Sequence, residues 1–168
     1  MKNDLSDKLS KILEFACHEA MRTGSYEIRP EHLILGVIRH RDNLAANLME
    51  ESGLALDYLK RTIEETVSSE TVIPYDRMED MVLSPQIVDI LGSSVKKSES
   101  EGREKTDSAD LIVTLCKDWG NFPASDEIKG RILERGERLV RKSDSGTIPA
   151  ESYNAIFSKI INNSKTLN

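Results

Sequence analysis

The sequence predicts an all-α fold in which two related four-helix units share one domain. Residues 5–39 align with residues 83–117 at a constant offset of 78 and without a gap. Seven of the 35 aligned positions are identical, where average composition gives roughly two. The apolar positions recur at helical spacing in both copies. Since 168 residues suffice for one full core but are short for two, we expect a single body with pseudo-two-fold symmetry.

The first predicted helix has an apolar stripe that its copy repeats. Ser6 is its expected N-cap, and Gly24 ends it. In the copy, Ser84 precedes Pro85 as an N-cap, and Gly102 ends the helix. The stripe consists of Leu5, Leu9, Ile12, Leu13, Ala16 and Ala20 in the first copy, and of Leu83, Ile87, Ile90, Leu91, Ser94 and Val95 in the second.

A more apolar helix is predicted next in each copy. The first covers residues 31–40 after Pro30, and the second runs from about 109 to 119. Asp107 is available as its cap, with Asp110 three residues on. Because these two segments are apolar over most of their surface, we expect them at the centre of the core.

Two further helices complete the first unit, at residues 42–52 and 56–67. In the second copy Ser125 caps a helix, and Gly136 matches Gly53 at an offset of 83. The longer offset indicates an enlarged turn before Ser125. The four-helix unit is therefore expected twice.

These assignments divide the chain into a domain and a terminal helix. The domain spans residues 1–146, with repeat one at 5–68, an extended linker at 69–82 and repeat two at 83–142. Residues 147–168 are expected to form an amphipathic C-terminal helix. Its apolar face either docks on the domain or contacts a partner or a second copy of the chain.

Composition narrows the class of partner. The chain has 29 acidic and 23 basic residues, a net charge of -6, so a nucleic-acid partner is disfavoured and a protein partner is favoured. No apolar run is long enough to cross a bilayer, and the start of the chain has no signal core. We therefore expect a cytoplasmic protein without membrane contacts.

The cysteines are expected in the core, with no disulfide or catalytic thiol. Cys17 falls opposite Val95 in the other copy, and Cys116 falls opposite Ile38, so each replaces an aliphatic residue. The cysteines and histidines lack metal-ligand spacing. The sequence thus predicts no metal site and no cofactor.

Residues 24–39 resemble the signature of the Clp N-terminal (Clp R) repeat family: a glycine, an Ile or Val, and Thr-Glu-His-Leu-Leu-Leu-Gly before an aliphatic pair. Residues 52–54 match the Gly-aliphatic step that follows in that family, and residues 73–74 and 83–85 resemble its join between repeats. The resemblance covers residues 5 to about 142. It implies an eight-helix domain that stands at the front of Hsp100 unfoldases and binds adaptors and substrate proteins.

The resemblance also implies a binding site. Glu31 matches the motif glutamate, which in the family receives cationic or phospho-arginine groups. Two interpretations stay open: a carboxylate that only stabilises the helix start, or an exposed carboxylate that pairs with a guanidinium. Arg29, Glu27 and Pro30 belong to the same expected contact surface, together with exposed parts of the first helix.

The chain departs from the family motif in both copies. Pro30 replaces the usual threonine, and Ala109 stands where the second glutamate would be. Asp110 lies one residue on, roughly 100 degrees around the helix, so it does not replace that glutamate. At most one such pocket is expected.

The motif histidine, His32, is expected to be a hydrogen-bonded structural residue and not a metal ligand or a base. His18 and His40 are expected on the surface.

No GxxxxGK[ST] phosphate loop occurs in the sequence, so ATP hydrolysis by that route is excluded. We expect a non-catalytic binding module of the Clp chaperone and protease system, as a monomer or weak dimer. It would bind adaptors or substrate proteins and modulate their delivery to a Clp ATPase. The alternatives are an interaction or dimerisation protein outside that system, or the N-terminal domain of a longer Clp ATPase. No catalytic motif supports an enzyme.

Overall fold

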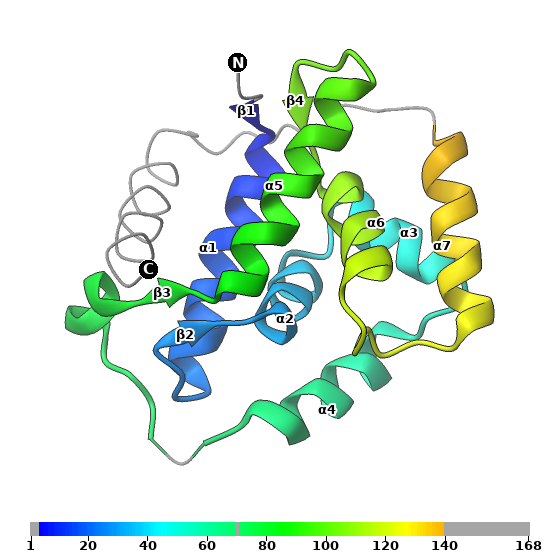
Figure 1. Ribbon diagram of the computed structural model, residues 1–168. Coiled ribbons are helices and arrows are strands. Elements are labelled where there is room, and N and C mark those ends of the chain that lie inside the picture. The colour runs from blue at the N-terminus through cyan, green and yellow to red at the C-terminus, as the bar shows by residue number, and fades with distance from the viewer. Residues whose placement is uncertain (1–3, 70, 140–168) are drawn as a thin grey trace.

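The computed structural model describes residues 4–69 and 71–139. Within them the chain forms seven α-helices, one 3-10 helix and four two-residue strands (Figure 1). The predicted C-terminal helix at 147–168 lies outside the described residues. The helices are α1 Asp7–Arg22, α2 Pro30–His40, α3 Leu44–Glu51, α4 Leu56–Val67, η1 Tyr75–Asp80, α5 Pro85–Ser100, α6 Ser108–Asp118 and α7 Asp126–Arg138. The strands are β1 Asp4–Leu5, β2 Glu27–Ile28, β3 Val82–Leu83 and β4 Lys105–Thr106.

The predicted all-α double repeat is confirmed, and the duplication is visible in the helix bounds. α5 and α6 begin and end 78 residues after α1 and α2. The predicted caps are present: the Ser6 hydroxyl oxygen accepts a hydrogen bond from the backbone of Leu9 at 3.1 Å. Ser84 does the same for Ile87 at 3.2 Å. Equivalent residues therefore start equivalent helices in the same way.

The four strands link the two repeats reciprocally. β1 pairs in parallel with β4, and β2 pairs in parallel with β3. Adding 78 to both members of the first pair yields the second pair. The flanking bonds follow the same rule, since Ser6 N donates to Thr106 O at 2.8 Å and Ser84 N donates to Ile28 O at 2.9 Å. This exchange is the pseudo-two-fold relation in atomic detail. The strands are too short to produce an alternating sequence pattern, so they were not predicted.

The core is centred on α2 and α6, as the apolar composition of these segments indicates. α1 packs closely against α2 at Gly36, where an added Cβ would lie 2.6 Å from the carbonyl oxygen of Ile12. α6 packs on α7 at Gly136, where a Cβ would lie 2.5 Å from a methyl carbon of Val113. Both glycines are thus positions of close helix contact.

α7 is the counterpart of α3, not of α4. Ser125 caps it by accepting a hydrogen bond from Ile128 N at 3.2 Å, and α3 and α7 pack against each other. α4 packs on α2 and α3 in the first repeat. The position of its counterpart in the second repeat falls after residue 139, outside the described residues. The repeat boundaries therefore stay a prediction.

The linker is only partly extended. It has no regular structure from Ser68 to Pro74 apart from the undescribed residue 70, but it then forms the 3-10 helix η1 before β3. The proline was correctly interpreted as a helix breaker, whereas the short turn after it has no apolar periodicity that would predict it.

The two cysteines are buried, as expected. Burial raises the pKa of each thiol, at Cys17 and at Cys116, to about 12, which keeps both protonated at neutral pH.

The expected surface position of His18 and His40 is wrong, because both are half-buried. The His40 ring lies 6.1 Å from the Phe15 ring, and the His18 ring lies 5.6 Å from the Tyr75 ring. Burial lowers the pKa of His18. Aromatic neighbours on other elements cover these rings, and periodicity along one helix does not reveal such neighbours.

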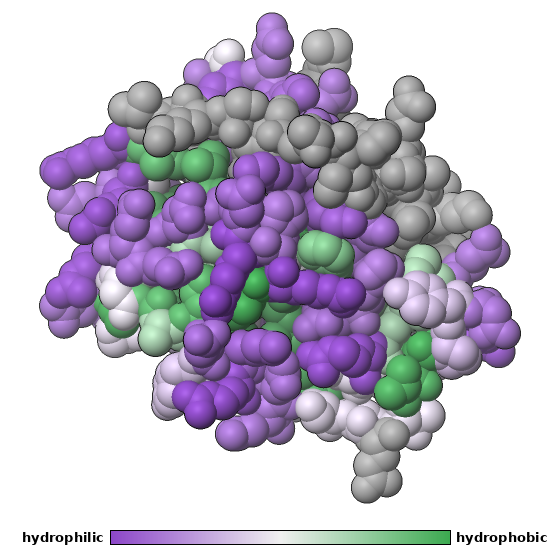
Figure 2. Space-filling view, turned by 180° about the vertical axis from the view of Figure 1, so that it is seen from behind, coloured by the Kyte–Doolittle hydropathy of each residue, from purple (hydrophilic) through white to green (hydrophobic). Residues whose placement is uncertain are grey.

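Seen from behind, the surface is mostly polar, with apolar side chains in separate areas (Figure 2). In residues 4–69 and 71–139, no helix is both long and apolar enough to cross a membrane. The same residues contain no group of His, Cys, Asp or Glu side chains suited to hold a metal ion.

Candidate functional site

The sequence-predicted site lies where β2 leads into α2, and we call residues 26–31 the tip. Glu31 is in the first turn of α2 and is half-buried. Its carboxylate makes no hydrogen bond or ion pair within the described residues. The exposed amide groups of the helix start stabilise its negative charge. Glu31 therefore presents a carboxylate that a cationic group can approach.

The neighbours of Glu31 are held in place by backbone contacts. Arg29 is the N-cap residue of α2 and is half-buried, and its Nε is buried without a hydrogen-bond partner. Pro30 is buried at the first helical position. A buried donor without an acceptor is costly, so the Arg29 guanidinium can gain an acceptor from a bound partner.

His32 supports the tip from below. The side chain is buried, and its Nδ1 accepts a hydrogen bond from Arg29 N at 2.9 Å. Its Nε2 lies 3.3 Å from the hydroxyl of Thr23. Burial, and then the charge of Arg29, lower the pKa of His32 to about 4, so the ring is neutral at physiological pH. The expected structural role of His32 is confirmed.

The tip also carries apolar surface that the sequence analysis did not single out. Glu27 is exposed on β2, and beside it Tyr26 is 44% exposed. Val72 and Tyr75 are 61% and 70% exposed. They lie in the segment that runs along the C-terminal end of α1, where Ile73 N donates to Met21 O at 2.9 Å. Aromatic residues in a turn and a linker were the available signal.

The first helix contributes less exposed surface than expected. Its outer residues Lys11, Glu14 and Phe15 are half-buried. Phe15 lies between two cations, with Lys11 Nζ 4.5 Å and the Arg39 guanidinium carbon 4.7 Å from the ring centroid. Long side chains from α1 and α2 thus cover this face.

The equivalent position in the second repeat is closed by the chain itself. Ala109, in place of a glutamate, is fully buried, and so is Asp110. Asp110 accepts hydrogen bonds from Arg103 Nη1 at 2.9 Å and from Lys97 Nζ at 3.2 Å. Its carboxylate is therefore already paired with cations.

These features define the class of protein: an all-α domain of two pseudo-symmetric helical repeats, with a single open tip and no metal cluster in the described residues. The chain belongs to the family of the Clp repeat (R) N-terminal domain, whose family model matches residues 4–124.

Curated relatives match over a short part of their length. ClpC/MecB of Bacillus subtilis (strain 168), a negative regulator of genetic competence, is 29% identical over 62 residues. The chaperone protein ClpB of Oceanobacillus iheyensis is 27% identical over 62 residues. Each match covers 37% of this chain and 8% of the relative.

Solved structures with this fold come from the same group of proteins. The N-domain of ClpV from Vibrio cholerae has a TM-score of 0.61 at 19% identity, covering 96% of this chain and 87% of that one. The N-terminal domain of Hsp104 from Candida albicans has a TM-score of 0.64 at 17% identity, covering 84% and 96%. The ClpV N-domain in complex with a VipB peptide has a TM-score of 0.60 at 19% identity, covering 96% and 89%.

Proposed function

We propose that this chain is a non-catalytic module that binds adaptor or substrate proteins through the tip and so modulates their delivery to a Clp ATPase. The unpaired carboxylate of Glu31 at the start of α2 carries the proposal. It is supported by membership of the Clp N-terminal repeat family and by the peptide complex of the ClpV N-domain.

The tip offers three kinds of contact to a protein partner. Glu31 and Glu27 supply acceptors, Arg29 supplies a buried donor without a partner, and Tyr26 supplies exposed aromatic surface. A cationic side chain next to an apolar residue satisfies all three. The partner segment therefore carries an arginine, free or phosphorylated, beside an apolar side chain.

A module of this kind acts by mass action. It holds a bound partner at the tip, and the amount of that partner free to meet an ATPase falls accordingly. The direction of the effect on proteolysis depends on whether the same partner segment also contacts the ATPase.

Matched peptides test the site. Labelled peptides with an apolar residue beside arginine, phospho-arginine or glutamine are titrated against wild type and Glu31→Gln. We expect the substitution to weaken the better arginine peptide by at least about tenfold, because a charge-assisted hydrogen bond is worth roughly 1.5–3 kcal/mol. The glutamine peptide should lose little.

Glu65→Gln is the control, since Glu65 is exposed on α4 and outside the tip. It should leave every affinity unchanged, and both variants should unfold at the temperature of wild type. Equal affinity of Glu31→Gln and wild type for the arginine peptides would leave Glu31 with a role in the helix start alone.

A further inference from the structure

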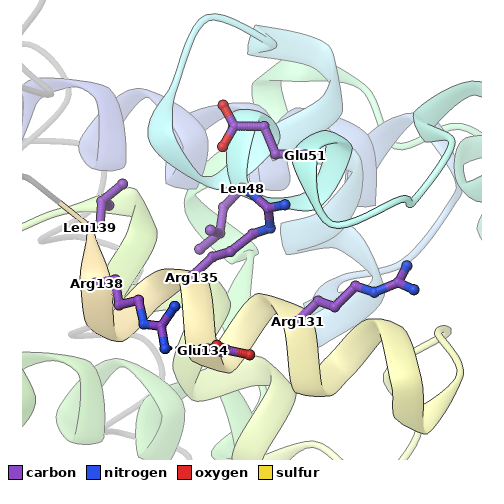
Figure 3. Close-up of a pocket in the computed structure, with 7 residues that line it drawn as sticks. All are labelled: Leu48, Glu51, Arg131, Glu134, Arg135, Arg138 and Leu139. Atoms are coloured by element: carbon purple, nitrogen blue, oxygen red, sulfur yellow. Dashed lines mark ion pairs between the residues drawn. The ribbon is translucent and has the colours of Figure 1, made fainter.

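A second surface feature lies away from the tip, between α3 and α7. It is an open cavity of about 500 Å³, a size that accommodates a few side chains of a partner. Two helices line it, and the residues are labelled in Figure 3. They are Leu48, Glu51, Arg131, Glu134, Arg135, Arg138 and Leu139.

The three arginines of the cavity differ in their contacts. Arg131 is engaged, with Nη2 at 2.6 Å from Glu127 and Nη1 at 3.5 Å from the carbonyl oxygen of Ser52. Arg138 pairs with Glu134 at 3.0 Å. Arg135 makes no ion pair or hydrogen bond within the described residues, and Figure 3 shows it extending from α7 toward α3.

Helix packing alone does not account for Arg135. The C-terminal turn of α3 is negative through its carbonyl groups and has no basic residue. Arg131 already caps one of these carbonyls, and Glu51 makes no ion pair with Arg135 although both line the cavity. The Arg135 guanidinium thus faces an open space with its donors available.

The rest of the lining restricts the ligand. Leu48 and Leu139 provide an apolar wall beside the arginines. Glu51 and Glu134 oppose the approach of a dense anion such as phosphate but tolerate a singly charged group. Residues 140–168 hold four basic and two acidic side chains, so the chain's own C-terminal segment has the wrong charge for this cavity.

We propose that the cavity between α3 and α7 binds an acidic peptide segment of a partner protein, with a carboxylate on Arg135 and an adjoining apolar side chain against Leu48 and Leu139. Clustered arginines are a known means of recognising acidic motifs. The carboxylate accepts hydrogen bonds from the guanidinium of Arg135, and the apolar side chain is removed from water. This surface is separate from the tip and does not depend on Glu31.

Fluorescence anisotropy with defined probes tests the cavity. A labelled peptide that repeats Leu-Glu-Glu is titrated against the full chain, and a Leu-Gln-Gln peptide serves as the uncharged match. We expect the glutamate peptide to bind at least about tenfold more tightly, and Arg135→Glu to weaken it by at least about tenfold. Arg61→Glu on α4 changes the net charge equally at an exposed site outside the cavity, and it should have little effect.

The outcomes separate this surface from the alternatives. Equal binding of the two peptides, equal loss in Arg135→Glu and Arg61→Glu, or no binding by wild type would each overturn the proposal. Competition by inorganic phosphate at the concentration of the glutamate peptide would also overturn it, because the site would then recognise free anions. Glu31→Gln should bind the glutamate peptide as wild type does, so failure here is distinct from failure at the tip.

Discussion

His32 and Asp110 occupy equivalent positions, 78 residues apart, and each closes the start of its helix in the same way. Arg29 N donates to His32 Nδ1 at 2.9 Å, and Asp107 N donates to Asp110 Oδ2 at 2.9 Å. The geometry is shared but the charge is not. His32 is neutral, whereas Asp110 is an anion paired with Arg103 and Lys97.

The neutral state of His32 makes stability depend on pH. In the unfolded chain a histidine binds a proton near pH 6.5, but the pKa of native His32 is about 4. Between these values the unfolded state binds more protons, so stability falls as pH falls from about 6.5 toward 4. The loss attributable to His32 is about 3 kcal/mol in all.

His32→Gln isolates this contribution, since glutamine at the third helical position can accept the same backbone hydrogen bond without titrating. Urea unfolding at a series of pH values should show the difference between wild type and variant narrowing toward pH 4. His18 has its pKa lowered in both proteins and cancels. Parallel curves would contradict the assignment.

The buried ion pair of Asp110 should matter far more than an exposed pair. Asp110→Asn keeps the cap but removes the charge that faces Arg103, and we expect it to lower the free energy of unfolding by about 3 kcal/mol. Asp80→Asn breaks the exposed pair with Arg77 and should cost less than about 1 kcal/mol. Denaturant melts of both variants provide the comparison.

A double-mutant cycle then measures the pair itself. Arg103→Gln combined with Asp110→Asn should destabilise less than the sum of the single changes, with a coupling of about 1–3 kcal/mol. Additive effects would show that the two side chains contribute independently.

Two helical glycines should respond to alanine in opposite directions. At Gly36 the new Cβ would meet the backbone of α1 at Ile12 and Ala16, and we expect a loss of about 1–3 kcal/mol. At Gly92 in α5 no atom lies within 4 Å of the Cβ position, so the gain in helix propensity should add roughly 0.5–1 kcal/mol. Thermal melts decide both, and equal signs would contradict the packing at Gly36.

The thiols should be unreactive in the native state. A pKa of about 12 at Cys17 and Cys116 lowers the thiolate fraction at pH 8 about a thousandfold relative to the model value of 9.0. A thiol-specific reagent should label both cysteines at once in denaturant and only slowly without it. Rapid labelling of the folded chain would show that one of them is accessible.

Much of the fold was predictable because it depends on local signals. The caps at Ser6 and Ser84, and the positive φ of Gly24 and Gly102, are short-range features that the sequence displays directly. The duplication at offset 78 supplied the symmetry. The paired strands were missed because two residues carry no periodicity.

At the tip, the sequence located Glu31, Arg29, Pro30 and Glu27 through a family resemblance, and their role in binding stays a proposal. It did not indicate that Tyr75 would lie against His18, because that contact joins segments far apart in the chain.

The sequence by itself determined the helices, their ends and the twofold repetition, since hydrogen-bonded turns and apolar spacing act over a few residues. Only the tertiary structure decided which of two equivalent helix starts stays open. In one repeat Glu31 has no cationic neighbour within the described residues, and in the other Arg103 folds back onto Asp110. That difference depends on where side chains from separate turns meet, and the energy of such an ion pair is set by its burial.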